Sequence, residues 1–215
     1  MRPRNDLLPV DSTAFSLSSN PPEPPERREG HRQLTLFRVG AMTVAGRREL
    51  CLIRNISGGG MMIRPYCDVA EGTPLVIELK TGCSVPCTVS WSRDGLVGVT
   101  FQTLIDVVEI LSTSDEGPRP RMPRIEVNCL ATVRDGSRIY RMRVQDVSQG
   151  GVKLESAVVV EPGANLVVSL PGLDPQTAAV RWNEDGFLGL TFNRLLPLTE
   201  LVEWLRAMRE QLRAA

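Results

Sequence analysis

The sequence predicts a mainly β protein in which two similar antiparallel barrels follow one another, each ending in a helix. The first observation is a duplicated motif of the form (Asn/Asp)-x-Ser-x-x-Gly, which begins at Asn55 and again at Asp146, 91 residues later (146 − 55). The same offset relates four further identical pairs: Gly72 and Gly163, Trp91 and Trp182, Gly98 and Gly189, and Phe101 and Phe192. A repeat of this length is a duplicated domain, because solenoid units are roughly 20–50 residues long.

Alternating apolar residues predict the strands within each repeat. Residues 75, 77 and 79 are Leu, Ile and Leu, and their counterparts 166, 168 and 170 are Leu, Val and Leu. A spacing of two is the period of a half-buried strand. The segments Ser92–Gly95 and Asn183–Gly186 each end in Asp-Gly, which tolerates the positive φ values of a tight hairpin. Several short strands with regular turns predict a small antiparallel barrel in each repeat.

Changes in composition divide the chain into four parts. Residues 1–26 are rich in Pro, Ser, Asn and Glu, which predicts a disordered N-terminal arm, or alternatively a docking peptide for a partner. The first domain is expected at residues 27–111 and the second at 119–215. Residues 112–118 form a polar, acidic linker that is short enough to hold the two barrels close together.

A helix is expected after each barrel. The first covers Leu104–Leu111 and is short. The second is marked by an apolar stripe at helical spacing, made of Leu198, Leu201, Val202, Leu205, Met208 and Leu212. Pro197 fits near its start, since proline suits the first turn of a helix. The stripe predicts a helix that lies on its own barrel or, as the alternative, a dimer contact.

The composition disfavours several classes of protein. The chain has 25 basic and 25 acidic residues, so no global field attracts nucleic acid or an anionic membrane. No apolar run reaches transmembrane length, and a cytoplasmic protein is therefore expected. The five cysteines have no recurring spacing and His31 is the only histidine, which indicates no metal site. No constellation of nucleophile, base and acid is present, so we expect no enzyme.

The basic residues are unusual in kind. Only Lys80 and Lys153 are lysines, which leaves 23 arginines (25 − 2). The surplus has two interpretations, a genomic codon bias or the bidentate recognition of phosphate and guanine, for which arginine is suited. An arginine cluster stands before each motif, at residues 27–32 and 119–124, where it would meet the entrance of each barrel.

Together, the cluster and the motif have the chemistry of a site for an anionic purine nucleotide. Arginine presents a fork of donors to phosphate oxygens or to the O6/N7 edge of guanine. Asn55 or Asp146 can accept hydrogen bonds from a guanine, the motif serines can donate to phosphate, and glycine permits close approach. The alternative is that Asn/Asp, Ser and Gly build a turn between two strands.

Taken as a pair and duplicated, these features resemble the PilZ domain family of bacteria. The family pattern is Arg-x-x-x-Arg followed some twenty to thirty residues later by (Asp/Asn)-x-Ser-x-x-Gly. The resemblance implies two tandem six-stranded antiparallel barrels and second-messenger signalling through binding of cyclic di-GMP. It covers about residues 27–101 and 119–192.

In the first domain the pattern is complete, and the implied ligand-binding residues are Arg27, Arg28, Arg32, Asn55, Ser57 and Gly60. By resemblance, the arginines clamp phosphates and guanines, Asn55 and Ser57 bind a guanine, and Gly60 allows close approach. The resemblance also implies that an arginine at position 27 favours an intercalated dimer of cyclic di-GMP. Core packing is expected for Trp91 and Trp182, because both repeats keep the tryptophan.

The second domain departs from the pattern because Pro120 stands at the position of the first motif arginine. Proline fixes φ and lacks an amide donor, so the loop must follow a different path. The candidate residues of this second site are Arg119, Arg121, Arg124, Asp146, Ser148 and Gly151. They indicate a weak site, or a barrel used only for structure or for a partner.

The sequence therefore predicts a non-catalytic cyclic di-GMP receptor that changes its interaction surface for a downstream protein partner, without nucleic acid binding, membrane insertion or a cofactor. One alternative is a ligand-independent interaction adaptor built on the same barrels, which the degenerate second motif favours. Another is a barrel that binds single-stranded nucleic acid, which the aromatic content of 5% and the zero net charge disfavour.

Overall fold

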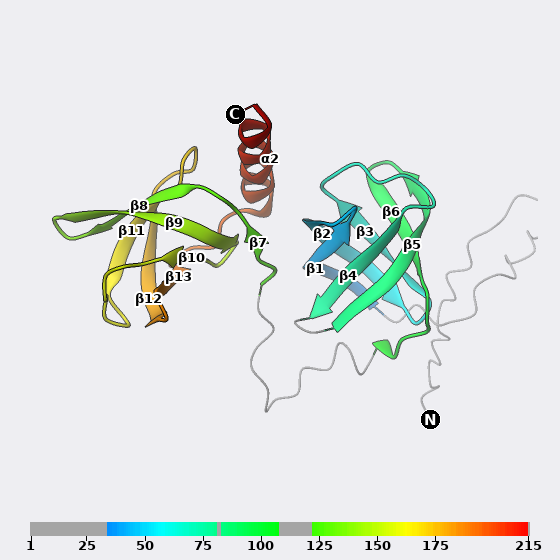
Figure 1. Ribbon diagram of the computed structural model, residues 1–215. Coiled ribbons are helices and arrows are strands. Elements are labelled where there is room, and N and C mark those ends of the chain that lie inside the picture. Colours follow the sequence, from blue (N-terminus) through cyan, green and yellow to red (C-terminus); the bar gives the residue numbers. More distant parts are fainter. Residues whose placement is uncertain (1–33, 81–82, 108–121, 215) are drawn as a thin grey trace, which may run out of the picture.

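The computed structural model describes residues 34–80, 83–107 and 122–214, which form two β-barrels with a helix between them (Figure 1). The first barrel has six strands: β1 (Leu34–Val44), β2 (Arg47–Ser57), β3 (Gly60–Pro65), β4 (Pro74–Lys80), β5 (Cys83–Arg93) and β6 (Leu96–Phe101). They close in the order β1-β2-β3-β6-β5-β4, and every pair is antiparallel.

The second barrel repeats this topology. Its strands are β8 (Leu130–Asp135), β9 (Arg138–Ser148), β10 (Gly151–Glu155), β11 (Asn165–Ser169), β12 (Gln176–Glu184) and β13 (Phe187–Phe192). They follow the order β10-β13-β12-β11-β8-β9, and the pairing of β9 with β10 closes the ring. A two-residue strand, β7 (Ile125–Glu126), adds to β9 and corresponds to the beginning of β1, since Leu34 pairs with Ile56 as Ile125 pairs with Val147. The predicted pair of six-stranded antiparallel barrels is confirmed.

Turn chemistry and inward alternation account for these strands. At the tips of β5–β6 and β12–β13, both residues of each Asp-Gly pair have positive φ: 54° and 70° for Asp94 and Gly95, and 53° and 77° for Asp185 and Gly186. These are the conformations that a tight hairpin requires, so the predicted tips are confirmed. The predicted alternating residues of β4, and those from Leu166 to Leu170, are buried in their barrel cores.

The helix α2 (Leu198–Ala214) covers one side of the second barrel. Of its apolar stripe, Leu201, Val202, Leu205 and Met208 are buried, together with Trp204, whose indole N–H donates to the Pro171 carbonyl at 2.7 Å. The predicted helix on its own barrel is confirmed. The first helix is predicted at Leu104–Leu111, but residues 104–106 are not helical and the helix begins later. Residues 108–111 lie outside the described part of the chain.

The same helix joins the two barrels (Figure 1). Arg209 donates from Nη1 to both carboxylate oxygens of Glu49 on β2, each at 2.7 Å, and the Glu49 side chain is 7% exposed. Arg206 donates to the Tyr66 carbonyl, just after β3. Leu50 of the first barrel packs in the apolar cluster of the second. The barrels are therefore held against each other. The linker at residues 112–118 and the arm at residues 1–26 lie outside the described residues. Among the described residues, no helix is long and apolar enough to cross a membrane.

We predict that Arg209→Ala loosens the joint between the barrels. The change leaves a nearly buried carboxylate without its partner, and we expect a cost of about 2 kcal/mol, below the full penalty for a buried pair because Arg209 is partly exposed. Urea unfolding followed separately in each barrel should then give two transitions in place of one. Glu203→Ala, an exposed change on the same helix, is the control, and an unchanged single transition for Arg209→Ala would contradict the prediction.

Candidate functional site

The duplicated motif forms the hairpin between the second and third strands of each barrel. Ser57 pairs with Gly60 across a two-residue turn, and Ser148 pairs with Gly151 in the same way. Each serine hydroxyl donates to the carbonyl of the paired glycine, at 3.0 Å in the first barrel and 3.3 Å in the second. These bonds fix the hairpin, so the serines have a structural role in the free protein.

The final glycine of each motif allows two backbones to approach closely. A Cβ at Gly60 would lie 2.3 Å from the Val99 carbonyl oxygen, and one at Gly151 would lie 2.1 Å from that of Leu190. These carbonyls belong to the neighbouring strand and cannot move aside without disturbing the ladder. Packing between strands therefore suffices to explain these glycines.

A β-bulge before the motif directs its first residue outward. In the first barrel the register shifts between Ile53 and Asn55, and in the second between Val144 and Asp146. The inward residues are consequently three apart instead of two, as for the buried pair Val144 and Val147. A bulge of this kind re-aims side chains, and here it leaves Asp146 on the outer surface of the barrel.

Strand β7 brings an arginine to this aspartate. Glu126 pairs with Asp146 in the ladder, so Arg124 enters beside the motif. Its Nη1 lies 2.9 Å from Oδ1 of Asp146, and the side chains are 38% and 20% exposed. Two residues before Arg124, the sulfur of Met122 would lie 3.1 Å from a Cβ at Gly150. The segment before β7 therefore lies over the motif hairpin. Asp146, Ser148, Gly151 and Arg124 are thus brought together.

The tryptophan of each repeat also lies outside the core, contrary to the sequence-based expectation. A second bulge shifts the register between Val180 and Trp182, and Trp182 then faces Gly189. A Cβ at Gly189 would lie 2.2 Å from the indole, so this glycine is needed for the ring to lie flat on the sheet. Trp91 and Gly98 repeat the arrangement in the first barrel. Both tryptophans are half-buried, and neither belongs to an apolar core cluster.

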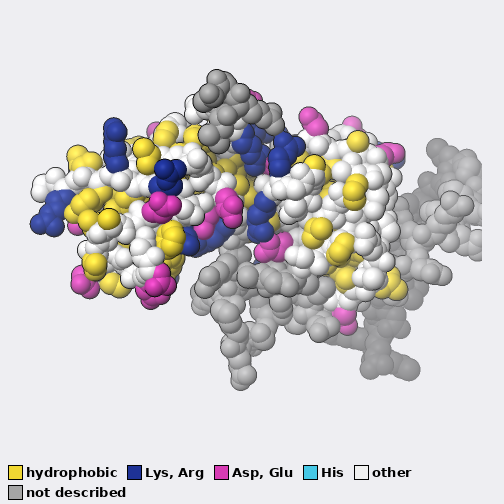
Figure 2. All heavy atoms as spheres, in the orientation of Figure 1, with side chains coloured by type: hydrophobic (Ala, Val, Ile, Leu, Met, Phe, Trp, Pro, Cys, Tyr) yellow, Lys and Arg dark blue, Asp and Glu magenta, His cyan; other side chains and the backbone are white. Residues whose placement is uncertain are grey.

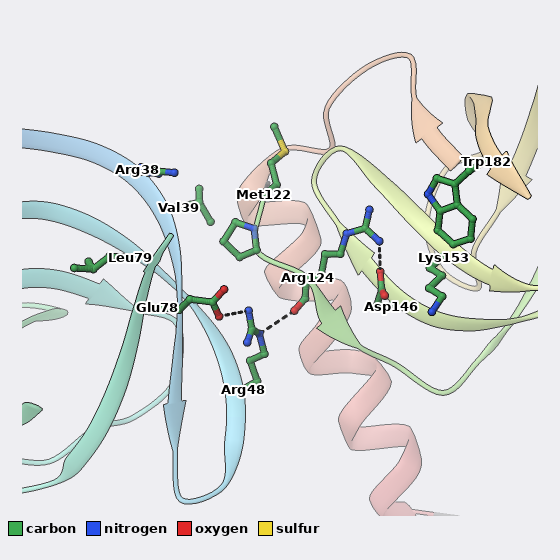
Figure 3. A pocket seen from close by; sticks show the side chains of 11 residues that line it. Arg38, Val39, Arg48, Glu78, Leu79, Met122, Arg124, Asp146, Lys153 and Trp182 are labelled. Carbon is green, nitrogen blue, oxygen red and sulfur yellow. Dashed lines mark hydrogen bonds and ion pairs between the residues drawn. The ribbon is translucent and has the colours of Figure 1, made fainter. Parts of the chain in front are cut away.

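A cavity of about 360 Å³ opens where the two barrels meet (Figure 3). The second barrel contributes Arg124, Asp146, Lys153 and Trp182, while β1, β2 and β4 of the first contribute Arg38, Val39, Arg48, Glu78 and Leu79. Met122 and Pro123 complete the lining. Four cationic and two acidic side chains give the wall a formal excess of two positive charges.

Arg48 connects the two sides of the cavity. Its Nη2 lies 2.5 Å from Oε2 of Glu78 in its own barrel, and its Nε donates to the Arg124 carbonyl at 3.0 Å. Figure 3 shows the resulting chain of contacts from Glu78 through Arg48 and Arg124 to Asp146. On the far side, the Lys153 ammonium sits 4.0 Å from the centre of the Phe187 ring, a cation–π contact that holds it near the opening.

The structure describes only part of the predicted first site. Asn55, Ser57 and Gly60 lie in the motif hairpin, whereas Arg27, Arg28 and Arg32 lie outside the described residues, as do Arg119 and Arg121 of the second site. Since Leu34 and Ile125 are equivalent in register, the residue equivalent to Arg124 is Gln33. Measured from the motif of its own barrel, Arg32 therefore stands one position farther upstream than Arg124.

Sequence reasoning missed the residues contributed by the first barrel. Arg38 and Arg48 carry no motif, and only the packing of one barrel on the other brings them to Asp146. Lys153 could have been noticed, since it is one of only two lysines and stands two residues after the motif. Trp182 was noticed but assigned to the core.

Two buried cysteines of the first barrel have thiols that stay protonated. Burial raises the pKa of the Cys51 and Cys87 thiols to about 12, so both stay protonated near neutral pH. No group of three or more His, Cys, Asp or Glu side chains in the described ranges could hold a metal ion.

Comparison with known proteins agrees with the fold. The model of the PilZ domain family matches residues 26–111 and 118–207. No curated protein matches the chain. Similar solved structures include PlzA of Borreliella burgdorferi in complex with c-di-GMP (12% identity, TM-score 0.36, covering 82% of this chain and 92% of that one). YcgR of Escherichia coli in complex with c-di-GMP has 13% identity, a TM-score of 0.35, and coverage of 82% and 88%. The Klebsiella pneumoniae MrkH–c-di-GMP complex has 10% identity, a TM-score of 0.31, and coverage of 83% and 90%. At these TM-scores the likenesses add no argument to the family match.

We predict that Gly60→Ala destabilises the first barrel by about 2 kcal/mol or more, because the new methyl group meets a strand carbonyl. Gly59→Ala is the matched control from the same motif, since its Cβ would make an ordinary 3.7 Å contact with Leu104. Chemical denaturation of both variants checks the difference. Equal stabilities would show that close strand packing does not explain the glycine.

We also predict that Arg124→Ala and Asp146→Ala each cost less than about 1 kcal/mol of folding stability, since the pair is partly exposed and screened by solvent. A double-mutant cycle of urea unfolding measures their coupling. A coupling well above that value would mean that the pair holds the fold together and could not be altered to test ligand binding.

Proposed function

The chain belongs to the PilZ domain family, and on this premise we propose that it is a cyclic di-GMP receptor without catalytic activity. The observation that carries the proposal is the Arg124–Asp146 pair at 2.9 Å, held by β7 beside a cavity with a formal excess of two positive charges. Cyclic di-GMP is a purine dinucleotide with two anionic phosphodiesters, so it complements this wall in both charge and hydrogen-bonding groups.

Four residues of the cavity have a stated role in this proposal. Arg124 and Lys153 attract phosphate, and the guanidinium of Arg124 can also stack on a base. The ion pair engages Oδ1 of Asp146, so Oδ2 can accept a hydrogen bond from the N1–H or the amine of a guanine. Trp182 offers an aromatic face next to the opening.

The motif of the first barrel is a second part of the proposal. Arg27, Arg28, Arg32, Asn55, Ser57 and Gly60 are the residues that the family pattern assigns there, with Arg27 favouring an intercalated dimer of the ligand. The outward position of Asn55 after its bulge supports this assignment. The two sites differ, because the first has the complete pattern and the second has its arginine already paired with the motif acid.

Binding is proposed to change the surface that the protein presents to a downstream protein. The walls of the cavity come from both barrels, so a ligand there contacts both and can alter how they meet. Nucleic acid is not part of the proposal, since the formal net charge is zero. The second candidate function is a ligand-independent adaptor, favoured by Pro120 at the place of a motif arginine.

We predict that calorimetric titration with cyclic di-GMP gives a saturable signal that Arg124→Ala weakens at least about tenfold, because a charge-assisted hydrogen bond is lost. Arg28→Ala tests the first site in parallel, and the stoichiometry of each variant assigns ligands to the two barrels. Arg134→Ala, an exposed arginine of β8 that does not line the cavity, is the matched control.

The outcomes separate the candidates. If Arg124→Ala removes one class of binding sites, the result supports ligand binding in the cavity between the barrels. If Arg28→Ala alone removes two ligands per chain, the result supports an intercalated dimer of the ligand in the first barrel. An absence of heat at high ligand concentration, repeated by equilibrium dialysis, would exclude the receptor and favour the adaptor.

A further inference from the structure

The duplication gives each barrel a copy of the same surface, and in the first barrel this surface receives a helix. Glu49 of β2 binds Arg209 of α2, Tyr66 after β3 accepts from Arg206, and Leu50 packs into the apolar cluster that contains α2. A hollow lined by Pro65, Tyr66, Cys67, Gly95 and their neighbours takes in the Arg206 side chain.

The offset of 91 residues locates the equivalent surface on the second barrel. There a groove of about 740 Å³ is lined by residues 139–143 of β9, residues 155–158 at and after the end of β10, and residues 185–187 at the β12–β13 tip. Its members Ser156, Ala157, Val158 and Gly186 are the counterparts of Pro65, Tyr66, Cys67 and Gly95, which line the hollow on the first barrel. We call it the β9–β10 groove. It shares no lining residue with the cavity between the barrels.

This groove exposes apolar side chains beside charged ones. Ile139 within the groove is 66% exposed, and Val159, which follows the groove residue Val158, is 87% exposed. Leu130, the counterpart of Val39, pairs with the groove residue Arg143 and is 54% exposed. Tyr140, Val158 and Phe187 add half-buried apolar surface. Figure 2 shows hydrophobic and basic side chains together over the β8–β9 hairpin, on the side of the second barrel away from the first. Exposed apolar residues clustered with charges are typical of interaction sites.

The groove lacks the acidic residue that binds α2 on the first barrel and has an arginine beside its place. The position of Glu49, which binds an arginine of α2, is occupied by Tyr140, and the position of Leu50 by Arg141. Arg138 and Arg141 are exposed and make no ion pair with a described residue. Of the acidic residues that line the groove, Glu155 is paired with Arg143, which leaves Asp185. An occupant should therefore carry acidic groups where α2 carries Arg206 and Arg209.

We propose that the β9–β10 groove binds an amphipathic helix of a partner protein, with its apolar stripe on Ile139 and Val158 and acidic side chains toward Arg138 and Arg141. Helices bind grooves of this kind through residues spaced at i, i+3, i+4 and i+7. The α2 helix of a second copy does not fit this role, because its apolar stripe is already buried on its own barrel and its facing charges are basic. The groove shares no lining residue with the cavity proposed for cyclic di-GMP, so the two are separate binding sites.

The test uses the full chain and a labelled helical peptide as the probe. The peptide has the sequence of residues 198–214 with Arg206→Glu and Arg209→Glu, which keeps the apolar stripe and reverses the charge. In fluorescence anisotropy we expect it to bind at least about tenfold more tightly than the unaltered peptide, and Ile139→Asp or Arg141→Glu in the protein to weaken it about tenfold. Both protein residues are exposed, so the fold should tolerate these changes.

The control variant is Leu104→Asp, an exposed apolar position on the first barrel that should leave peptide binding unchanged. Equal binding of the two peptides to the protein would overturn the proposal, and so would peptide binding that survives Ile139→Asp. In either case the peptide would have displaced α2 or bound elsewhere on the protein. Sedimentation of the full chain adds a further outcome. A dimer that Ile139→Asp dissolves would overturn it too, by assigning the groove to a second copy of the chain.

Discussion

The ion pair between Arg209 and Glu49 is the contact on which the relation between the two barrels depends. It joins a helix of the second barrel to a strand of the first with two donor contacts of 2.7 Å to a nearly buried carboxylate. A buried pair of this kind adds little net stability, because removing both charges from water costs about as much as their attraction returns. What it contributes is placement, since it fixes α2 of the second barrel against β2 of the first. Arg48, next to Glu49, then lies within reach of the Arg124 carbonyl and forms one wall of the cavity.

Two bulges in each barrel turn a structural hairpin into a candidate site. In a regular strand, the inward and outward positions alternate, and the motif residue would have a fixed face. The extra residue before Asp146 and the one before Trp182 shift the register, so both side chains lie outside the core and near the same opening. Glycines at 151 and 189 then permit the strand contact and the flat tryptophan that this geometry needs. Bulges and glycines therefore position the surface chemistry while the barrel supplies rigidity.

The duplication has different consequences for the two barrels. Their topology is the same, yet the first uses the surface around Glu49 to receive α2, while the equivalent surface of the second carries Ile139 and Tyr140. The motif has diverged as well, with an amide at Asn55 and a carboxylate at Asp146 that binds Arg124. Two copies of one fold have thus acquired distinct faces, one that contacts α2 within the chain and one that is exposed.

The sequence alone determined the fold class, the duplication, the strands around residues 75–79 and 166–170, the Asp-Gly hairpins and the last helix, because period, turn chemistry and helix stripes are local properties of the chain. It also located the motif and the arginine clusters. It assigned Trp91 and Trp182 to the core, since two bulges cannot be seen in an alternating pattern. Only the tertiary structure brought Arg38 and Arg48 to Asp146 and explained the final motif glycine by a strand carbonyl 2.1–2.3 Å from its missing Cβ. Those contacts join residues far apart in the chain, and they depend on the packing of one barrel against the other, which no local pattern encodes.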